Sequence, residues 1–496
     1  MLTALVLVTS ISYSQPVYQK TFPAIDKYVD SIMKDWNIPG VALAIVYKDQ
    51  LIYSKGYGYR DVEQKLPVQA STVFPIASNT KLFTATTAAM LAEEGKLSLD
   101  KPIRTYTNAI TFYNDELNAK VTLRDMLSHR TGLPRYDNIW VGSDYTRKEA
   151  VSKVIYMRPQ AGFREKWIYN NMMYTAAGFV MENVTGKTWE DLIREKLLQP
   201  LQMKSTYFTT ADMKKAGNYS LSFFEKDSTK TLLTKKYEAQ NDALGPAGTI
   251  RTSIEDISHW MIAQLNNGMY EGKQVIPAKA VAETMIPNII MDNEGKYDEL
   301  SNALYCLGRA IQTYKGYKIT SHTGSIDGYY SSLTFIPSAA LGIFMVHNSE
   351  SAGAFRSAMA YPVIDRLLQL PYTPWSQRYF TDYRKTETTI RRAKDSIDAT
   401  QLKGTTPSHP LAAYAGNYIN PIYGTINIEA IKDSLTMSFK KIKVALAHFH
   451  YDRFYVKATE DDAPKPRLNF LTNDKGDIDR ITMMLTGGEP DVFVKK

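Results

Sequence analysis

The four residues from Ser78 to Lys81 constrain this chain most, because they lie where an extended apolar segment gives way to a helix. Residues 72–76 favour an extended segment, residues 81–94 favour a helix, and Gly95 supplies a stop signal. Side chains three residues apart share one face of a helix, so the Lys81 amine can reach the Ser78 hydroxyl. A serine hydroxyl becomes a nucleophile when a neighbouring base takes its proton. The segment therefore predicts a nucleophile, a base and the free N–H groups of a helix start in one place.

A serine three residues before a lysine is also typical of an ordinary helix cap followed by a solvated lysine. Two later segments favour the catalytic interpretation. Tyr169 and Asn171 lie just before an apolar, helix-like run, and His322, Gly324 and Ser325 precede a β-rich run. Alone, each segment also fits a packing tyrosine or an ordinary strand end, so the argument depends on their combination.

In this order, the three segments resemble the serine β-lactamase and penicillin-binding-protein family, in particular its class C β-lactamase, D-aminopeptidase and esterase branch. That family carries S-x-x-K, then Y-x-N, then K-T-G or H-x-G. The resemblance covers about residues 20–370 of the chain. It implies an α+β fold in which an antiparallel sheet is flanked by helices and carries an inserted helical lobe.

The resemblance implies a role for each matching residue. Ser78 would be the acylated nucleophile, and Lys81 and Tyr169 would carry its proton, with Lys81 lowering the pKa of Tyr169. Asn171 would bind the substrate amide and orient Lys81. The backbone N–H groups of Ser78 and Ser325 would form the oxyanion hole. Which of the lysine and the tyrosine takes the serine proton stays open.

His322 and Gly324 complete the third motif as substrate-binding residues. Many β-lactamases and carboxypeptidases have a lysine where this chain has His322, and a neutral imidazole offers less positive charge to a substrate carboxylate. Gly324 lets a substrate backbone approach the strand closely. Aminopeptidase, other peptidase and esterase members of the family resemble the chain better at this position than β-lactamases do.

These residues predict a serine hydrolase that acts through a Ser78 acyl-enzyme on amide or peptide bonds. Its expected substrates are small or D-amino-acid-containing peptides of the cell envelope, cell-wall fragments included. Two alternatives stay open: an esterase or β-lactamase with the same catalytic residues, and a non-catalytic penicillin-binding or sensor protein.

The texture of the sequence changes beyond residue 406. Eight short β-type runs follow one another, separated by turn signals, and predict a small antiparallel β-barrel. This region resembles the lipocalin-like domain attached to some members of the family. The expected organisation is a signal peptide at 1–14, a hydrolase domain at 15–375, a charged linker at 376–405 and the barrel at 406–496.

Composition narrows the choice of partners. The net charge is +8, but lysines and arginines are spread along the 496 residues, without a basic stripe or a nucleic-acid motif. The single cysteine, Cys306, cannot form an internal disulfide and lacks metal-ligand spacing around it. We therefore expect no metal, no cofactor and no nucleic acid; a homo-oligomer stays open.

The N-terminus predicts export. Residues 2–11 are apolar but too few to span a bilayer, and the small residues Ser12 and Ser14 offer a cleavage site before Gln15. A buried N-terminal strand is the alternative. No other segment has the length and apolarity of a membrane helix. We expect a bacterial protein that is periplasmic or secreted.

Overall fold

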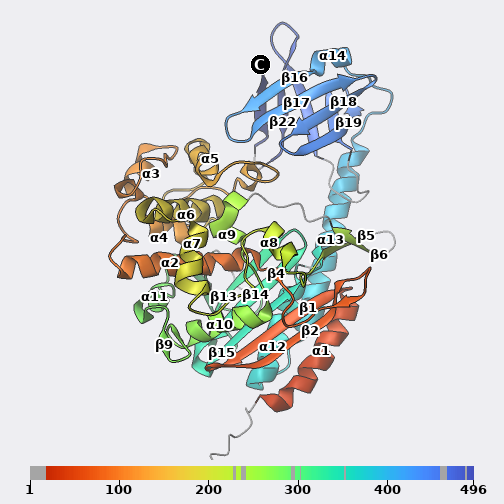
Figure 1. Ribbon diagram of the computed structural model, residues 1–496. Coiled ribbons are helices and arrows are strands. Elements are labelled where there is room, and N and C mark those ends of the chain that lie inside the picture. The colour runs from red at the N-terminus through yellow and green to blue at the C-terminus, as the bar shows by residue number, and fades with distance from the viewer. Residues whose placement is uncertain are drawn as a thin grey trace, which may run out of the picture.

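The computed structural model describes residues 18–226, 231–235, 242–291, 296–301, 303–350, 353–457, 466–485 and 489–496. These residues form a large antiparallel sheet flanked by helices, a helical lobe beside it, and a closed β-barrel at the C-terminal end (Figure 1). The predicted fold class is therefore confirmed. The predicted signal peptide, 1–14, lies outside the described residues.

The main sheet has nine strands in the order β10-β11-β12-β13-β14-β15-β1-β2-β3, all antiparallel to their neighbours. Its strands are β1 (Gly40–Tyr47), β2 (Gln50–Asp61), β3 (Leu66–Pro67), β10 (Ile289–Ile290), β11 (Leu304–Tyr305), β12 (Ala310–Tyr314), β13 (Tyr317–Ile326), β14 (Tyr329–Ile336) and β15 (Leu341–His347). The first and last parts of the hydrolase region meet inside the sheet, where β1 pairs with β15 and Val41 lies opposite His347.

The α-helices of the described residues are α1 (Phe22–Asp35), α2 (Thr80–Glu93), α3 (Asp115–Lys120), α4 (Leu123–Leu127), α5 (Arg147–Ser152), α6 (Asn171–Thr185), α7 (Trp189–Ile193), α8 (Thr210–Lys215), α9 (Gly245–Gly248), α10 (Ile254–Leu265), α11 (Ala278–Glu283), α12 (Phe355–Leu368), α13 (Trp375–Ala399) and α14 (Leu411–Tyr414). None of them is long and apolar enough to cross a membrane.

The apolar sequence of β1 follows from its position between two layers of helices. Successive side chains of a strand point to opposite faces of the sheet. The even-numbered residues 42–46 pack into a core that includes α2, α6 and α10, whereas the odd-numbered residues 41–45 pack against α1 and α12. Burial on both faces explains why the strand has no polar face.

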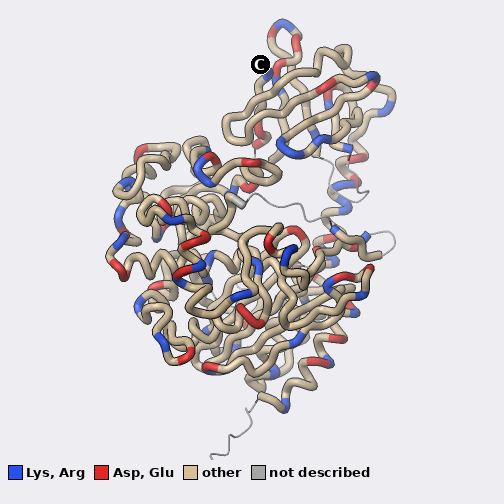
Figure 2. Tube along the Cα trace, viewed as in Figure 1, with Lys and Arg blue, Asp and Glu red and all other residues tan. Residues whose placement is uncertain are grey.

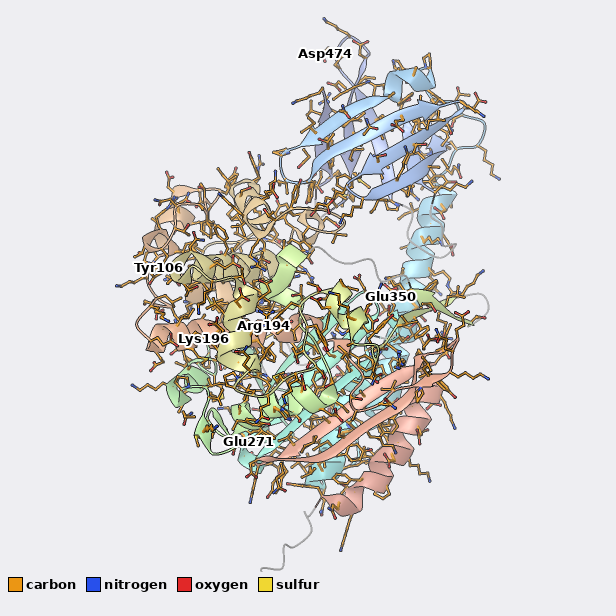
Figure 3. The ribbon with its side chains drawn as sticks, in the orientation of Figure 1. Tyr106, Arg194, Lys196, Glu271, Glu350 and Asp474 are labelled. Atoms are coloured by element: carbon orange, nitrogen blue, oxygen red, sulfur yellow. The ribbon has the colours of Figure 1, made fainter. Side chains whose placement is uncertain are left out.

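Three short antiparallel pairs lie outside the main sheet: β4 (Phe74–Pro75) with β7 (Arg251–Thr252), β5 (Ser222–Lys226) with β6 (Thr231–Lys235), and β8 (Met269–Tyr270) with β9 (Lys273–Gln274). The first pair leads directly into α2. The β5–β6 hairpin is held by an ion pair of 2.6 Å between Lys235 and Glu350, which lies beside it (Figure 3).

The C-terminal strands close into the predicted barrel. They are β16 (Gly416–Asn420), β17 (Gly424–Ile431), β18 (Ser434–Phe439), β19 (Ile442–His450), β20 (Arg453–Val456), β21 (Arg467–Thr472), β22 (Ile478–Met483) and β23 (Asp491–Lys495). Each pairs with the next, and β16 also pairs with β23, so that no strand edge is left open. The short helix α14, which ends at Tyr414, precedes the first of these strands.

The 25-residue helix α13 joins the hydrolase region to the barrel (Figure 1). At its start Trp375 is buried, and Trp36 Nε1 donates a hydrogen bond of 3.0 Å to Ser376 Oγ. Near its end Asp398 forms an ion pair of 3.1 Å with Arg467 of β21. Charged residues of both signs are scattered over both regions (Figure 2), as the composition suggests.

Candidate active site

Ser78 is the one residue between Thr72 and Leu91 that is not fully buried. It lies in a 3₁₀ turn, η2 (Ala77–Asn79), which immediately precedes α2. The α-helix itself begins at Thr80, one residue before the predicted start at Lys81. Ala77 adopts a left-handed backbone conformation, with φ of 50°, and so bends the chain ahead of the nucleophile. The turn therefore presents the Ser78 hydroxyl at the surface of an otherwise buried segment.

The main sheet holds this turn in place. Ser331 Oγ on β14 donates to the Ile76 carbonyl at 2.8 Å and accepts from Asn79 Nδ2 at 2.8 Å. On β13, a Cβ added at Gly324 would lie 2.1 Å from the same Ile76 oxygen. The third motif thus reaches the first one through direct backbone contact, and Gly324 is needed where the turn and strand approach each other.

Lys81 connects three segments of the chain within the site. Its Nζ lies 3.1 Å from Ser78 Oγ, 2.7 Å from Asn171 Oδ1 and 2.6 Å from the Ala247 carbonyl oxygen of α9. The resemblance predicted the first two neighbours. The carbonyl of Ala247 was missed, because no side-chain type signals a backbone acceptor.

These neighbours define the chemistry of the Lys81 amine. The Ala247 oxygen and Asn171 Oδ1 can only accept hydrogen bonds, so a neutral amine donates its two N–H groups to them. Its lone pair is then left for the Ser78 hydroxyl. Complete burial lowers the pKa of Lys81 well below its ordinary value, against an opposing effect of Asp137. A neutral amine aimed at a serine hydroxyl is a general base.

Tyr169 lies on the loop before α6 and reaches the same hydroxyl. The Lys81 Nζ is 4.9 Å from the centre of its ring, and its phenol forms a hydrogen bond with Ser78. Burial nevertheless raises the pKa of Tyr169 above its ordinary value. The expectation that Lys81 lowers this pKa is therefore wrong, because the desolvation of the phenol outweighs the effects that favour the phenolate. Tyr169 holds its proton and can donate it.

Asn171 is the first residue of α6, rather than part of the loop as expected, and Asn170 caps the helix through Met173 N at 3.0 Å. The Asn171 amide lies between two partners: Oδ1 faces Lys81, and Nδ2 donates to Asp137 Oδ1 at 3.0 Å. A carboxylate only accepts, so Asp137 fixes which way the amide points. Asp137 was not predicted, because it lies 34 residues away in sequence, in a segment without a recognisable motif.

His322 lies on β13 with both ring nitrogens engaged. Nδ1 is 2.7 Å from the Thr323 carbonyl oxygen, which requires Nδ1–H, and Nε2 therefore accepts from the Tyr305 hydroxyl at 3.0 Å. Burial lowers the pKa of His322 to about 3, so the ring is neutral. A substrate-binding role for His322 stays a prediction, and any contact would have to compete with Tyr305.

Ser325 is exposed on β13, and this strand packs along the turn that carries Ser78. The two predicted oxyanion donors are thus brought to the same place. A cation that the sequence analysis missed lies beside them: Arg356 of α12 donates to the Gly324 carbonyl at 2.9 Å. Burial lowers the pKa of Arg356. Positive charge at this strand comes from Arg356, because His322 carries none.

Buried histidines should make the protein sensitive to acid. Burial lowers the pKa of both His322 and His347 to about 3, whereas an unfolded chain binds a proton at each below about 6.5. Stability is therefore lost as pH falls below this value, by up to about 1.4 kcal/mol per pH unit for each ring. Urea unfolding of His347→Gln between pH 7 and 5 should show a shallower loss than wild type, while the partly exposed His409→Gln should follow wild type. Equal slopes for both variants would contradict this.

Comparison with known proteins assigns the family. Residues 25–367 match the Beta-lactamase family, and residues 400–496 match DUF3471, a domain of unknown function. The chain belongs to the β-lactamase family and is a serine hydrolase related to penicillin-binding proteins, as the order of the three motifs predicted.

Relatives and structural neighbours agree with this assignment. The chain is 27% identical over 446 residues to the unguisins hydrolase ungD of Aspergillus violaceofuscus, covering 81% of this chain and 76% of the relative. It is 25% identical over 343 residues to protein flp of Staphylococcus aureus, covering 66% of this chain and 63% of flp.

Two solved structures share the fold over nearly the whole chain. The octameric penicillin-binding protein homologue from Pyrococcus abyssi has a TM-score of 0.62 and 20% identity, covering 95% of this chain and 99% of its own. SurE in complex with D-Leu has a TM-score of 0.55 and 18% identity, covering 96% and 100%.

Proposed function

We propose that this hydrolase cleaves amide or peptide bonds in small or D-amino-acid-containing peptides through an acyl-enzyme on Ser78. The observation that carries the proposal is the position of Lys81. Its amine lies 3.1 Å from Ser78 Oγ while obligate acceptors hold its two other directions. This arrangement gives the serine a base before any substrate binds.

In the proposed reaction, Ser78 Oγ attacks the carbonyl carbon as its proton passes to Lys81 Nζ. The oxyanion that forms is stabilised by the backbone N–H groups of Ser78 and Ser325. Tyr169 gives its proton to the departing amine and regains one from Lys81. Water then attacks the acyl-enzyme with the same groups in reverse, which releases the acid and restores the serine hydroxyl.

The protonated Tyr169 favours an amide over an ester as the substrate. An amine is a poor leaving group unless it receives a proton, whereas an alkoxide leaves more readily. A phenol whose pKa is raised by burial keeps this proton available at neutral pH. Esterase and β-lactamase activity with the same residues remain alternatives.

Two relatives support the substrate class. SurE was solved with D-Leu, and ungD is named as a hydrolase of unguisins. The apolar N-terminal run leads us to propose further that the enzyme is exported and acts in the cell envelope. N-terminal sequencing of the protein from its native host should find Gln15 first; an intact Met1 in the cytosol would contradict export.

A covalent probe tests the nucleophile. A fluorophosphonate should label the wild type on Ser78, as located by peptide mass mapping, and Ser78→Ala should lose the label. A panel of D- and L-aminoacyl amides, peptides, p-nitrophenyl esters and a chromogenic cephalosporin should then show the largest kcat/KM for amides or peptides. Unchanged labelling of Ser78→Ala would disprove the assignment, and a preference for esters would support the alternative.

A further inference from the structure

The barrel inserts a lysine into the hydrolase region next to the active site. Lys440 lies in the tight turn between β18 and β19, with a left-handed φ of 55°. Its Nζ donates to the carbonyl oxygens of Asn138, Ile139 at 2.9 Å and Val141 at 3.0 Å. An ammonium has three N–H donors, so these carbonyls account for all of them.

Lys440 is the centre of a wider contact with one loop. Asn138 Nδ2 donates to the Leu485 carbonyl of the barrel, and the Lys441 N–H donates to the Gly142 carbonyl at 3.0 Å. The Lys441 side chain forms an exposed ion pair with Asp144. The barrel therefore binds residues 138–144 largely through hydrogen bonds to their backbone, and these bonds fix the path of the loop.

The residue just before this contact belongs to the active site. Asp137 begins the 3₁₀ turn η4 (Asp137–Ile139), whose last carbonyls Lys440 caps. On its other side, Asp137 accepts from Asn171 Nδ2 at 3.0 Å and from Arg135 Nε at 2.7 Å. Two carbonyls of one three-residue turn are thus held by the barrel, and the side chain of its first residue orients a catalytic amide.

We propose that Lys440 is a positioning residue for catalysis: by capping the turn from the barrel, it holds Asp137 where Asp137 keeps the Asn171 amide correctly oriented. This inference rests on the proposed function, in which Lys81 activates Ser78. It assigns the barrel a part in the chemistry without placing any barrel atom against the substrate.

The physical reason lies in the near symmetry of an amide group. The oxygen and the nitrogen of the Asn171 amide have similar size, so only their hydrogen-bond partners decide which one faces Lys81. If Asp137 moves away, the amide can turn, and its N–H groups then face the Lys81 amine. The lone pair of Lys81 would accept from Asn171, and Ser78 would lose its base.

Lys440→Asn tests this with little disturbance of the turn. Asparagine tolerates the left-handed conformation but is too short to reach the three carbonyls. Lys441→Asn is the matched control, because it removes a neighbouring ammonium of the same hairpin that does not touch the turn beginning at Asp137. We expect the second-order rate of fluorophosphonate labelling at Ser78 to fall about tenfold in Lys440→Asn, as for a misplaced remote support, and to stay near wild type in Lys441→Asn. Lys440→Gly is a second variant with the same expected result.

A double-mutant cycle separates positioning from a general loss of structure. If Lys440 acts through Asp137, adding Lys440→Asn to Asp137→Ala should cause little further loss of labelling rate. Additive losses, or a Lys440→Asn rate equal to that of Lys441→Asn, would overturn the inference. Thermal unfolding of each variant confirms that the folded protein is compared. If the wild type itself is not labelled at Ser78, the proposed function fails; if it is labelled and only the cycle disagrees, the inference alone fails.

Discussion

Replacing Lys81 with methionine should lower kcat/KM by about 10³-fold while the protein stays folded. The variant removes the lone pair that takes the Ser78 proton, and general base catalysis contributes about 10²- to 10⁴-fold. Methionine has a similar length and suits a side chain that is fully buried. Two opposing effects act on stability: the desolvation of an amine is no longer required, but the Ala247 carbonyl and Asn171 Oδ1 lose their donor. Activity with a chromogenic amide and urea unfolding measure both effects.

The pH profile adds a second signature. Wild-type kcat/KM should fall on the acid side as Lys81 takes up a proton, and this limb reports a pKa below that of an ordinary lysine. Lys81→Met should lose the limb together with the rate. The exposed Lys120→Met, which only breaks an ion pair with Glu116, is the control. Retention of more than about a third of wild-type kcat/KM, a loss under 1 kcal/mol, would show that another group is the base.

Substituting alanine for Gly324 should abolish most activity for a different reason. The new Cβ would lie 2.1 Å from the Ile76 carbonyl oxygen and 2.4 Å from Ser331 Oγ. The Ile76 oxygen belongs to the backbone, so it can move only if the turn that carries Ser78 moves with it. We expect at least about a 10²-fold loss in kcat/KM, comparable to the loss of an oxyanion donor, and about 1–3 kcal/mol of destabilisation from overpacking.

Gly248→Ala is the matched control for this prediction. Gly248 lies on another side of the same turn, and a Cβ there would come no closer than 3.7 Å to Ala77, which is ordinary contact. Its activity and melting temperature should stay near those of the wild type. If Gly324→Ala kept wild-type labelling of Ser78, the turn would be more adaptable than its hydrogen bonds imply.

Much of the site could be predicted because its residues lie in short motifs with local meaning. The spacing of Ser78 and Lys81 depends on one helix turn, and their contact at 3.1 Å follows from it. The eight barrel strands could also be predicted, since apolar runs and turn signals act locally. Here sequence and structure differ by only a few residues at the ends of elements.

The site residues that the sequence analysis missed are brought to the site by tertiary contacts. Asp137, Tyr305 and Arg356 reach the site from three separate segments, and none lies within a motif that states its partner. Their effect depends on tertiary contacts, as does the burial that reverses the expected pKa shift of Tyr169. Sequence spacing predicts which groups meet along a helix; it does not predict how much water surrounds them.

Helix α13 connects the hydrolase region to the barrel, and this connection tolerates few changes in the number of its residues. At 1.5 Å per residue its 25 residues span about 37 Å, and each end is fixed by its own contacts, Trp375 at the sheet and Asp398 at the barrel. One inserted or deleted residue would turn everything beyond it by about 100° around the helix axis. The barrel would then lose its contacts with the loop at residues 138–144. In proteins with this arrangement, insertions and deletions should therefore occur in the barrel turns and not in the helix, because the helix length sets the position of the barrel relative to the active site.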